Sequence, residues 1–188
     1  SFNSVFVRAN TLLREIAKTI RKDLPAELLD NMKKSEEALE QLWYPYSGQY
    51  YSRNFVTHKL LKEPTIGTLM PLYAGTITHE RAKKLVTMLE NENLFGPNYP
   101  VPSTAVNSAW FKPTGYWQGP SWVNTNWLII DGLRRYNFED HAEALKETTL
   151  EMIRSGGFYE YFNPLTGQPA GAPDFSWTAA LAIDLSKS

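Results

Sequence analysis

The sequence contains no cysteine, no long apolar run and no strong excess of either charge. Without cysteine the chain cannot form disulfides, thiolate metal sites or a thiol nucleophile. Without a run of about 18 apolar residues it has no segment that could cross a membrane as a helix. The 19 basic and 20 acidic residues give a net charge of −1, which does not favour nucleic acid. We therefore expect neither a membrane nor a nucleic acid as a partner.

Motifs for metals, phosphates and serine nucleophiles are missing as well. The sequence has no HExxH run, no GxGxxG or GxxxxGKS/T loop and no GxSxG elbow. Its three histidines are scattered, and none of them has a metal-ligand spacing. We therefore predict no metal site and no cofactor.

The start of the chain suggests a piece of something longer. It begins at Ser1 without methionine or a secretory leader, and it runs directly into a helical pattern. We expect residues 1–188 to be the C-terminal portion of one longer domain, with no internal boundary. Such a portion would be a proteolytic, truncated or nicked piece. A cytoplasmic location is the working expectation.

Helical periodicity dominates what is present, and 43% hydrophobic residues are enough to bury a core. Thr78 and Asp174 are the expected N-caps of two helices, and Pro120 is expected in the first turn of another. The first two helices should form a hairpin joined by one or two residues. Residues 44–66 should form a loop, in which short alternating stretches such as 50–53 are candidates for pairing in a small β-hairpin. Apolar residues at a spacing of 3.6 predict helices over about 3–24, 28–43, 69–74, 78–89, 120–133, 139–155 and 174–186.

The helices come in pairs. The helix over 120–133 carries apolar residues in most directions and should be buried, whereas the next one, over 139–155, has a single apolar face. Such pairs are typical of an α/α toroid. About seven helices predict an all-α fold, about half of an (α/α)6 toroid of helical hairpins with long aromatic loops. Half a ring exposes an apolar seam, which the N-terminal half of the same domain or a neighbouring chain should cover.

The loops hold most of the unusual side chains. Sugars stack their C–H faces on aromatic rings and bind their hydroxyls to amides and carboxylates, so such loops favour a carbohydrate substrate. The alternative is that these rings are core residues next to ordinary turns. The loop over 95–119 is also long enough to suggest a functional role. Three segments mix aromatic rings with Gln, Asn or Glu: 42–51, 116–127 and 157–167.

Glu160 is the most distinctive acidic residue. It lies within the aromatic run Phe-Tyr-Glu-Tyr-Phe over 158–162. An acid among rings tends to be desolvated, which suits it to proton transfer. The alternative is a surface glutamate on a short strand.

Two long runs resemble a known family. YWQGPSWVNTNWLIIDGLRRY is followed by GFYEYFNPLTGQPAGAPDFSWTAAL, and together they resemble the C-terminal part of the α/α-toroid enzymes of glycoside hydrolase family 63. The bacterial mannosylglycerate hydrolase-like members are the most similar. LWYPYSGQYYSRN, IGTLMPLYAG and NYPVPSTAV resemble segments of the same group, in the same order.

The resemblance implies inverting hydrolysis of an α-glucoside or α-mannoside, with a glycosylglycerate among the candidates. Inversion needs two carboxyl groups roughly 6.5–9.5 Å apart. The family's general base is the glutamate of the F-Y-E-x-F/Y motif, which falls on Glu160. The resemblance further implies substrate-binding roles for Trp43, Tyr116, Trp117, Gln118, Trp122, Asn124 and Trp177.

The family's general acid has no counterpart in this sequence. It is the aspartate of a W-E-S-G-x-D-like motif, and no such motif occurs in these 188 residues. Tyr44 and Pro45 also stand where family members often carry acidic residues. The chain is therefore expected to supply the base and part of the pocket but not the acid, and to be nearly inactive alone.

Other interpretations remain open. The chain could be a carbohydrate-binding or scaffold module without catalysis, or a helical-repeat interaction protein whose rings are core. It could also belong to another toroid hydrolase that acts on glucans or trehalose. An upstream W-E-S-G-x-D-like segment would favour the enzyme, and an unchanged function in Glu160→Gln would favour the repeat protein.

Overall fold

The structure is a computed structural model that describes residues 1–187. Its helices are α1 (Phe2–Thr19), α2 (Ala26–Glu40), α3 (Ile66–Leu69), α4 (Pro71–Ala74), α5 (His79–Leu89), α6 (Val123–Arg135), α7 (Glu139–Gly156) and α8 (Ser176–Leu185). Its antiparallel strand pairs are β1 (Trp43–Tyr44) with β2 (Gln49–Tyr50), β3 (Ser52–Arg53) with β4 (Leu60–Leu61), and β5 (Tyr161–Phe162) with β6 (Pro169–Ala170).

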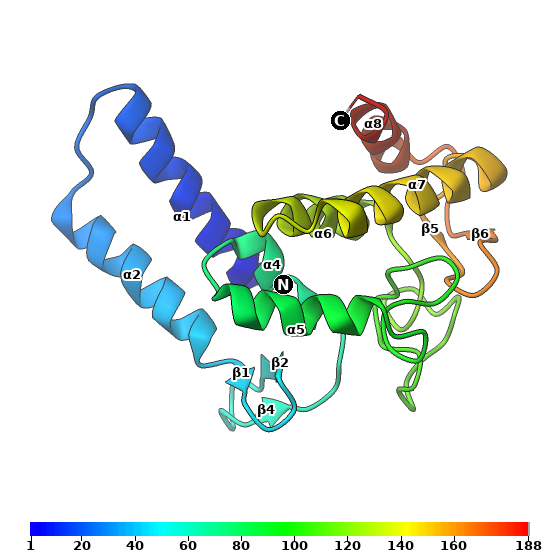
Figure 1. Ribbon diagram of the computed structural model, residues 1–188, viewed down its shortest axis with the longest axis horizontal. Helices are drawn as coiled ribbons and strands as arrows, with labels where there is room; N and C mark the ends of the chain where they lie inside the picture. Colours follow the sequence, from blue (N-terminus) through cyan, green and yellow to red (C-terminus); the bar gives the residue numbers. More distant parts are fainter. Residues whose placement is uncertain (188) are drawn as a thin grey trace.

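The helices form one row with a second row beside it (Figure 1). Helix α1 contacts α4, α4 contacts α6 and α6 contacts α8, so these four helices make up the first row. Helix α2 packs beside α1, and α7 packs beside α6. This alternation is the one that the sequence predicts for stacked helical hairpins.

Helix α6 lies in the middle of the first row because its surface is apolar and small where its neighbours approach. Ile129, Ile130 and Leu133 are buried in the main core. Gly132 lies against the backbone of α4, where an added Cβ would stand 2.7 Å from the carbonyl carbon of Leu72. Helix α7 buries one face only, as its sequence pattern indicates.

Several element boundaries differ from the predictions. Helix α1 ends at Thr19, since Arg21 has a left-handed φ of 54°, and residues 20–25 form a longer connection than expected. Thr78 does cap α5, and its hydroxyl accepts a hydrogen bond from the Arg81 N–H at 3.3 Å. Pro120 is not in the first turn of α6. It lies in the extended segment before the helix, where its carbonyl accepts a hydrogen bond from the Ser103 N–H.

The expected hairpin pairing around residues 50–53 is present. Tyr50 pairs with Trp43, and Ser52 pairs with Leu61, so the stretch contributes to two small hairpins. The prediction of an N-cap at Asp174 was wrong, because Phe175 holds that position in α8.

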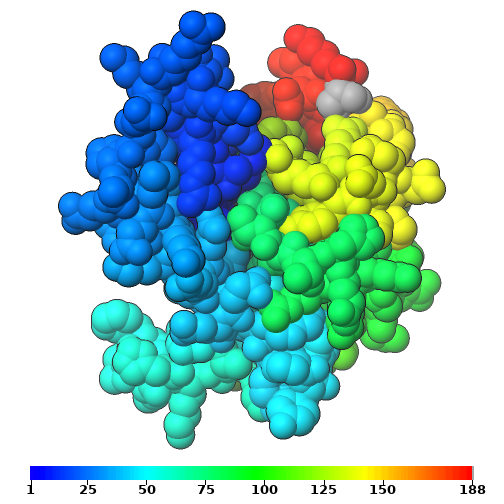
Figure 2. Space-filling view, turned by 60° about the vertical axis from the view of Figure 1, so that its left-hand side comes forward, coloured from blue at the N-terminus to red at the C-terminus, as the bar shows by residue number. Residues whose placement is uncertain are grey.

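The two ends of the first row expose large apolar side chains. On α8 these are Trp177 and Ile183, and Figure 2 shows α1 (blue) at the upper left of the molecule and α8 (red) at the upper right. A hollow of about 460 Å³ between the start of α1 and Trp117 has an apolar lining. On α1 the exposed apolar residues are Phe2, Val5, Phe6, Leu12, Leu13 and Ile16.

None of the described helices is long and apolar enough to cross a membrane.

Candidate active site

The two long aromatic motifs lie side by side, joined through their backbones. The Ser121 N–H donates to the Phe162 carbonyl at 2.9 Å, and the Phe162 N–H donates back to the Ser121 carbonyl at 2.9 Å. The Ser121 hydroxyl also donates to the Tyr99 carbonyl at 2.6 Å. Segments 116–127 and 157–167, which the sequence singles out separately, therefore belong to one site.

The β5–β6 hairpin follows Glu160 and is anchored on the long loop. The Tyr99 N–H donates to the Pro164 carbonyl at 2.9 Å. Gly167, with a φ of 72°, lets the hairpin lie on the ring of Tyr99, since a Cβ there would stand 2.9 Å from the ring. On the other side, the Thr178 hydroxyl at the start of α8 donates to the Tyr159 carbonyl at 2.6 Å. Glu160 thus sits on a segment that is anchored on both sides.

Glu160 itself is half-buried and is held by one neighbouring residue. Its N–H donates to the Ala172 carbonyl at 3.0 Å, and its Oε2 accepts a hydrogen bond from the Ala172 N–H at 3.2 Å. Within residues 1–187 the second oxygen, Oε1, has no hydrogen bond. One carboxylate oxygen is therefore oriented by the fold, and the other is left for a water or a ligand.

Four aromatic rings lie beside this segment. Trp117 stacks flat on Trp122, with ring centroids 4.1 Å apart and planes 1° apart. Tyr161 packs against Trp122 at 5.0 Å, and Tyr116 packs against both of them. Trp122 is 1% exposed, whereas Trp117 is 40% and Tyr116 53% exposed. The buried ring supports two open ones, and together they make the aromatic surface: Tyr116, Trp117, Trp122 and Tyr161.

Two amide side chains flank the aromatic surface. Gln118 is exposed, and its backbone carbonyl accepts a hydrogen bond from the Lys112 N–H at 2.7 Å, which closes the turn that carries Trp117. Asn124 lies in the first turn of α6 and is half-buried. Its Oδ1 is buried and has no hydrogen-bond partner within the described residues.

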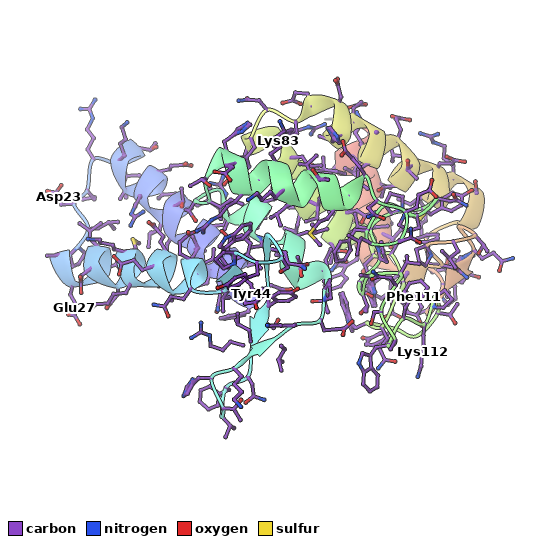
Figure 3. The ribbon with its side chains drawn as sticks, turned by 60° about the horizontal axis from the view of Figure 1, so that its bottom comes forward. Asp23, Glu27, Tyr44, Lys83, Phe111 and Lys112 are labelled. Atoms are coloured by element: carbon purple, nitrogen blue, oxygen red, sulfur yellow. The ribbon has the colours of Figure 1, made fainter. Side chains whose placement is uncertain are left out.

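Trp177 and Trp43 lie in different surroundings. Trp177 is 53% exposed near the start of α8, which is bonded to the segment around Glu160. Trp43 packs edge-on against Tyr50, and the Arg81 guanidinium lies over its ring at 4.7 Å. In Figure 3, Tyr44, the neighbour of Trp43, lies apart from Phe111 and Lys112 of the long loop. The contacts of Trp43 therefore belong to a second cluster.

That second cluster is built around a charged pair. Arg81 pairs with the Glu40 carboxylate and donates to the Tyr50 hydroxyl at 3.1 Å. Burial raises the pKa of the Tyr50 phenol well above its usual range, and the Glu40 charge acts in the same direction. A neutral phenol and a paired arginine give this cluster a structural role beside α2 and α5.

Asn126 is a structural residue that the sequence did not single out. It is fully buried, and its Oδ1 accepts a hydrogen bond from the Val101 N–H at 3.0 Å. Its Nδ2 donates to the Pro100 carbonyl at 2.8 Å and to the Thr149 hydroxyl at 3.0 Å. The second asparagine of the N-x-N run thus ties α6 to α7 and to the loop that carries Tyr99.

We expect Asn126→Ala to lower the free energy of unfolding by on the order of 3 kcal/mol. The change leaves the buried Val101 N–H and Pro100 carbonyl without partners, and each such group costs about 1–3 kcal/mol. Urea unfolding of the complete domain measures the loss. Asn107→Ala, at an exposed position, is the control and should change it by less than about 0.5 kcal/mol. Equal losses in the two variants would contradict the role of Asn126.

No group of three His, Asp or Glu side chains that could hold a metal ion occurs in residues 1–187.

A solved structure defines the class of fold as a portion of an α/α toroid. The GH63 mannosylglycerate hydrolase from Thermus thermophilus, solved in complex with Tris, matches with a TM-score of 0.92 and 36% sequence identity. The match covers 100% of this chain and 45% of that chain. The predicted fold class is confirmed.

The chain belongs to the family of the mannosylglycerate hydrolase MGH1-like glycoside hydrolase domain, which it matches over residues 1–178. It is 38% identical to a mannosylglycerate hydrolase of Thermus thermophilus over 184 residues, which are 97% of this chain and 43% of that protein. It is 34% identical to the glucosylglycerate hydrolase of Mycolicibacterium hassiacum over 133 residues, 69% of this chain and 30% of that protein. The chain thus spans less than half the length of these relatives, and the resemblance seen in its sequence is confirmed.

Proposed function

We propose that this chain supplies the general base and part of the sugar pocket of an inverting α-glycoside hydrolase. The observation that carries the proposal is Glu160, oriented by Ala172 beside the aromatic surface, in a chain of this family. The free Oε1 would take a proton from the water that attacks the anomeric carbon. Because Ala172 already holds Oε2, the Glu160 side chain would lose little conformational entropy when the water binds to Oε1.

The remaining residues would bind the sugar. Trp117 and Tyr116 present exposed rings on which the C–H groups of a sugar can stack. The buried ring of Trp122 would support this contact, because it stacks against the ring of Trp117. The exposed amide of Gln118 is suited to a sugar hydroxyl, whereas the unpaired Oδ1 of Asn124 is buried and would accept a hydroxyl only after its side chain turns toward the pocket. We assign Trp177 to the back of the site.

The substrate-binding role of Trp43 stays a prediction. Its ring contacts lie with Arg81 and Tyr50 in the second cluster, so it would meet only a part of the substrate remote from the bond that is cleaved.

The general acid would lie in the rest of the domain, the N-terminal half. Inversion needs a second carboxyl group roughly 6.5–9.5 Å from the base. The exposed apolar side chains of α1 and α8 are suited to pack against that half, because they terminate the row of helices. The chain alone should therefore be nearly inactive.

The substrate class we propose is an α-glycoside of glycerate. Two relatives are named for mannosylglycerate and glucosylglycerate, and the two sugars differ at a single hydroxyl group. The exposed rings would stack on either of these two sugars. The choice between them would therefore depend on the amide side chains and on residues of the N-terminal half of the domain.

The test is hydrolysis by the complete domain of a panel of α-glucosides and α-mannosides that includes the glycerate conjugates. Proton NMR of the first product formed reports its anomeric form, and we expect the β-anomer because the mechanism inverts. An α-anomer as the first product would contradict inversion. If no compound is cleaved but sugars bind, the alternative of a carbohydrate-binding module is favoured.

We expect Trp117→Ala to raise KM by up to about tenfold with a smaller effect on kcat, because an aromatic contact contributes about 0.5–1.5 kcal/mol to binding. Trp117→Phe keeps a ring over Trp122 and should retain most of the affinity. Steady-state kinetics on the substrate that the panel identifies would measure both. An unchanged KM in Trp117→Ala would show that this ring does not contribute to sugar binding.

A further inference from the structure

Gly171 lies in direct contact with Glu160. It follows β6 and has a φ of 77°, in the left-handed region. A Cβ added there would stand 2.8 Å from the Glu160 Cβ, 2.8 Å from its Oε2 and 2.7 Å from the Tyr161 ring. All three distances are shorter than real Cβ contacts. The backbone at Gly171 therefore approaches Glu160 and Tyr161 more closely than a residue with a Cβ could without displacing them.

This close approach places the next residue where it orients the carboxylate. Ala172 exchanges two hydrogen bonds with Glu160, one with its backbone N–H and one with its side-chain Oε2. A backbone donor to a carboxylate is a charge-assisted bond, which is stronger than a bond between neutral groups. The direction of the carboxylate therefore depends on how near the backbone of residues 171–172 comes to Glu160.

We propose that Gly171 is a positioning residue for Glu160, which it holds in the orientation that leaves Oε1 toward the attacking water. The inference rests on the proposed role of Glu160 as the base. A methyl group at Gly171 must displace either the carboxylate or the Ala172 N–H, because the Glu160 Cβ is fixed to the backbone and cannot rotate away.

The expected effect falls on kcat. A displacement of about 1 Å in a catalytic group can lower the rate about 100-fold. We therefore expect kcat of Gly171→Ala to fall about 100-fold in the complete domain. KM should change less than kcat, because the nearest neighbours of a Cβ at Gly171 are Glu160 and Tyr161 and not the proposed stacking rings, Tyr116 and Trp117. A loss of folded protein alone would also lower the apparent kcat at constant KM, so the folded fraction of each variant is measured by urea unfolding and kcat is expressed per folded protein.

Gly75 is the matched control. Its φ of 74° is close to that of Gly171, but the nearest atom to a Cβ added there is the Arg135 Cδ at 3.4 Å, an ordinary contact. Gly75→Ala therefore carries a similar backbone strain without the close contact, and it should leave kcat within a few-fold of wild type. If Gly171→Ala does not fold, Gly171→Asn replaces it, since asparagine tolerates the left-handed region yet carries a Cβ.

The outcomes separate this inference from the proposed function. The panel substrate is assayed with wild type, Gly171→Ala, Gly75→Ala, Glu160→Gln and the double variant Gly171→Ala/Glu160→Gln. We expect the double variant to be no slower than Glu160→Gln, because Gly171 acts only through the carboxylate. If Glu160→Gln is inactive but Gly171→Ala matches Gly75→Ala, the inference is wrong and the function stands. If Glu160→Gln is as active as wild type, the proposed function itself fails.

Discussion

Glu160→Gln is expected to lower kcat of the complete domain by about 10²- to 10⁴-fold, the range that general-base assistance contributes. The amide oxygen of glutamine can still accept the hydrogen bond from the Ala172 N–H, so the local backbone should keep its geometry. What is lost is the ability to take a proton from water. KM and the free energy of unfolding should therefore stay near their wild-type values.

A second glutamate provides the control for this substitution. Glu151 is exposed on α7, away from the aromatic surface, and Glu151→Gln removes the same charge. Its kcat should equal that of wild type. The assignment of Glu160 is overturned if the two glutamine variants hydrolyse the panel substrate at the same rate, and the repeat-protein interpretation then gains support.

Trp122→Ala is expected to lower the free energy of unfolding by about 3–5 kcal/mol, the usual loss when a large aromatic side chain is removed from a core. Trp122 is among the largest fully buried side chains, and its indole N–H donates to the Tyr116 carbonyl at 3.1 Å. The loss also removes the support under Trp117, so activity should fall in the fraction that remains folded. Urea unfolding and kinetics on the same sample measure the two effects.

Trp122→Phe separates the two contributions. Phenylalanine keeps a ring beneath Trp117 but has no N–H for Tyr116, so its stability should lie between those of wild type and Trp122→Ala. A stability of Trp122→Ala within about 1 kcal/mol of wild type would be incompatible with a buried supporting ring.

The long helices and the site segments could be predicted because each leaves a local signal. Amphipathic spacing marks α7, and the mixture of rings and amides marks the segment 116–127. Boundaries such as the end of α1 were harder, because the left-handed turn at Arg21 gives no pattern in the sequence.

The assembly of the site could not be predicted from local signals. The bridge between Ser121 and Phe162 joins residues that are far apart in the chain, and only tertiary structure pairs them. Nothing local shows that Trp122 is buried while the nearby motif residue Trp117 is open. The close approach of Gly171 to Glu160 was equally hidden, since a glycine in a loop rich in Gly and Pro indicates only an ordinary turn.

The bonds between Ser121 and Phe162 run between main-chain atoms in both directions. Side-chain replacements at these two positions leave both bonds chemically intact, and only proline, which lacks the N–H, would remove one. The attachment of the hairpin that follows Glu160 therefore does not depend on which side chains stand at these two positions. Relatives could exchange both side chains and still keep this hairpin beside the carboxylate that we propose as the base.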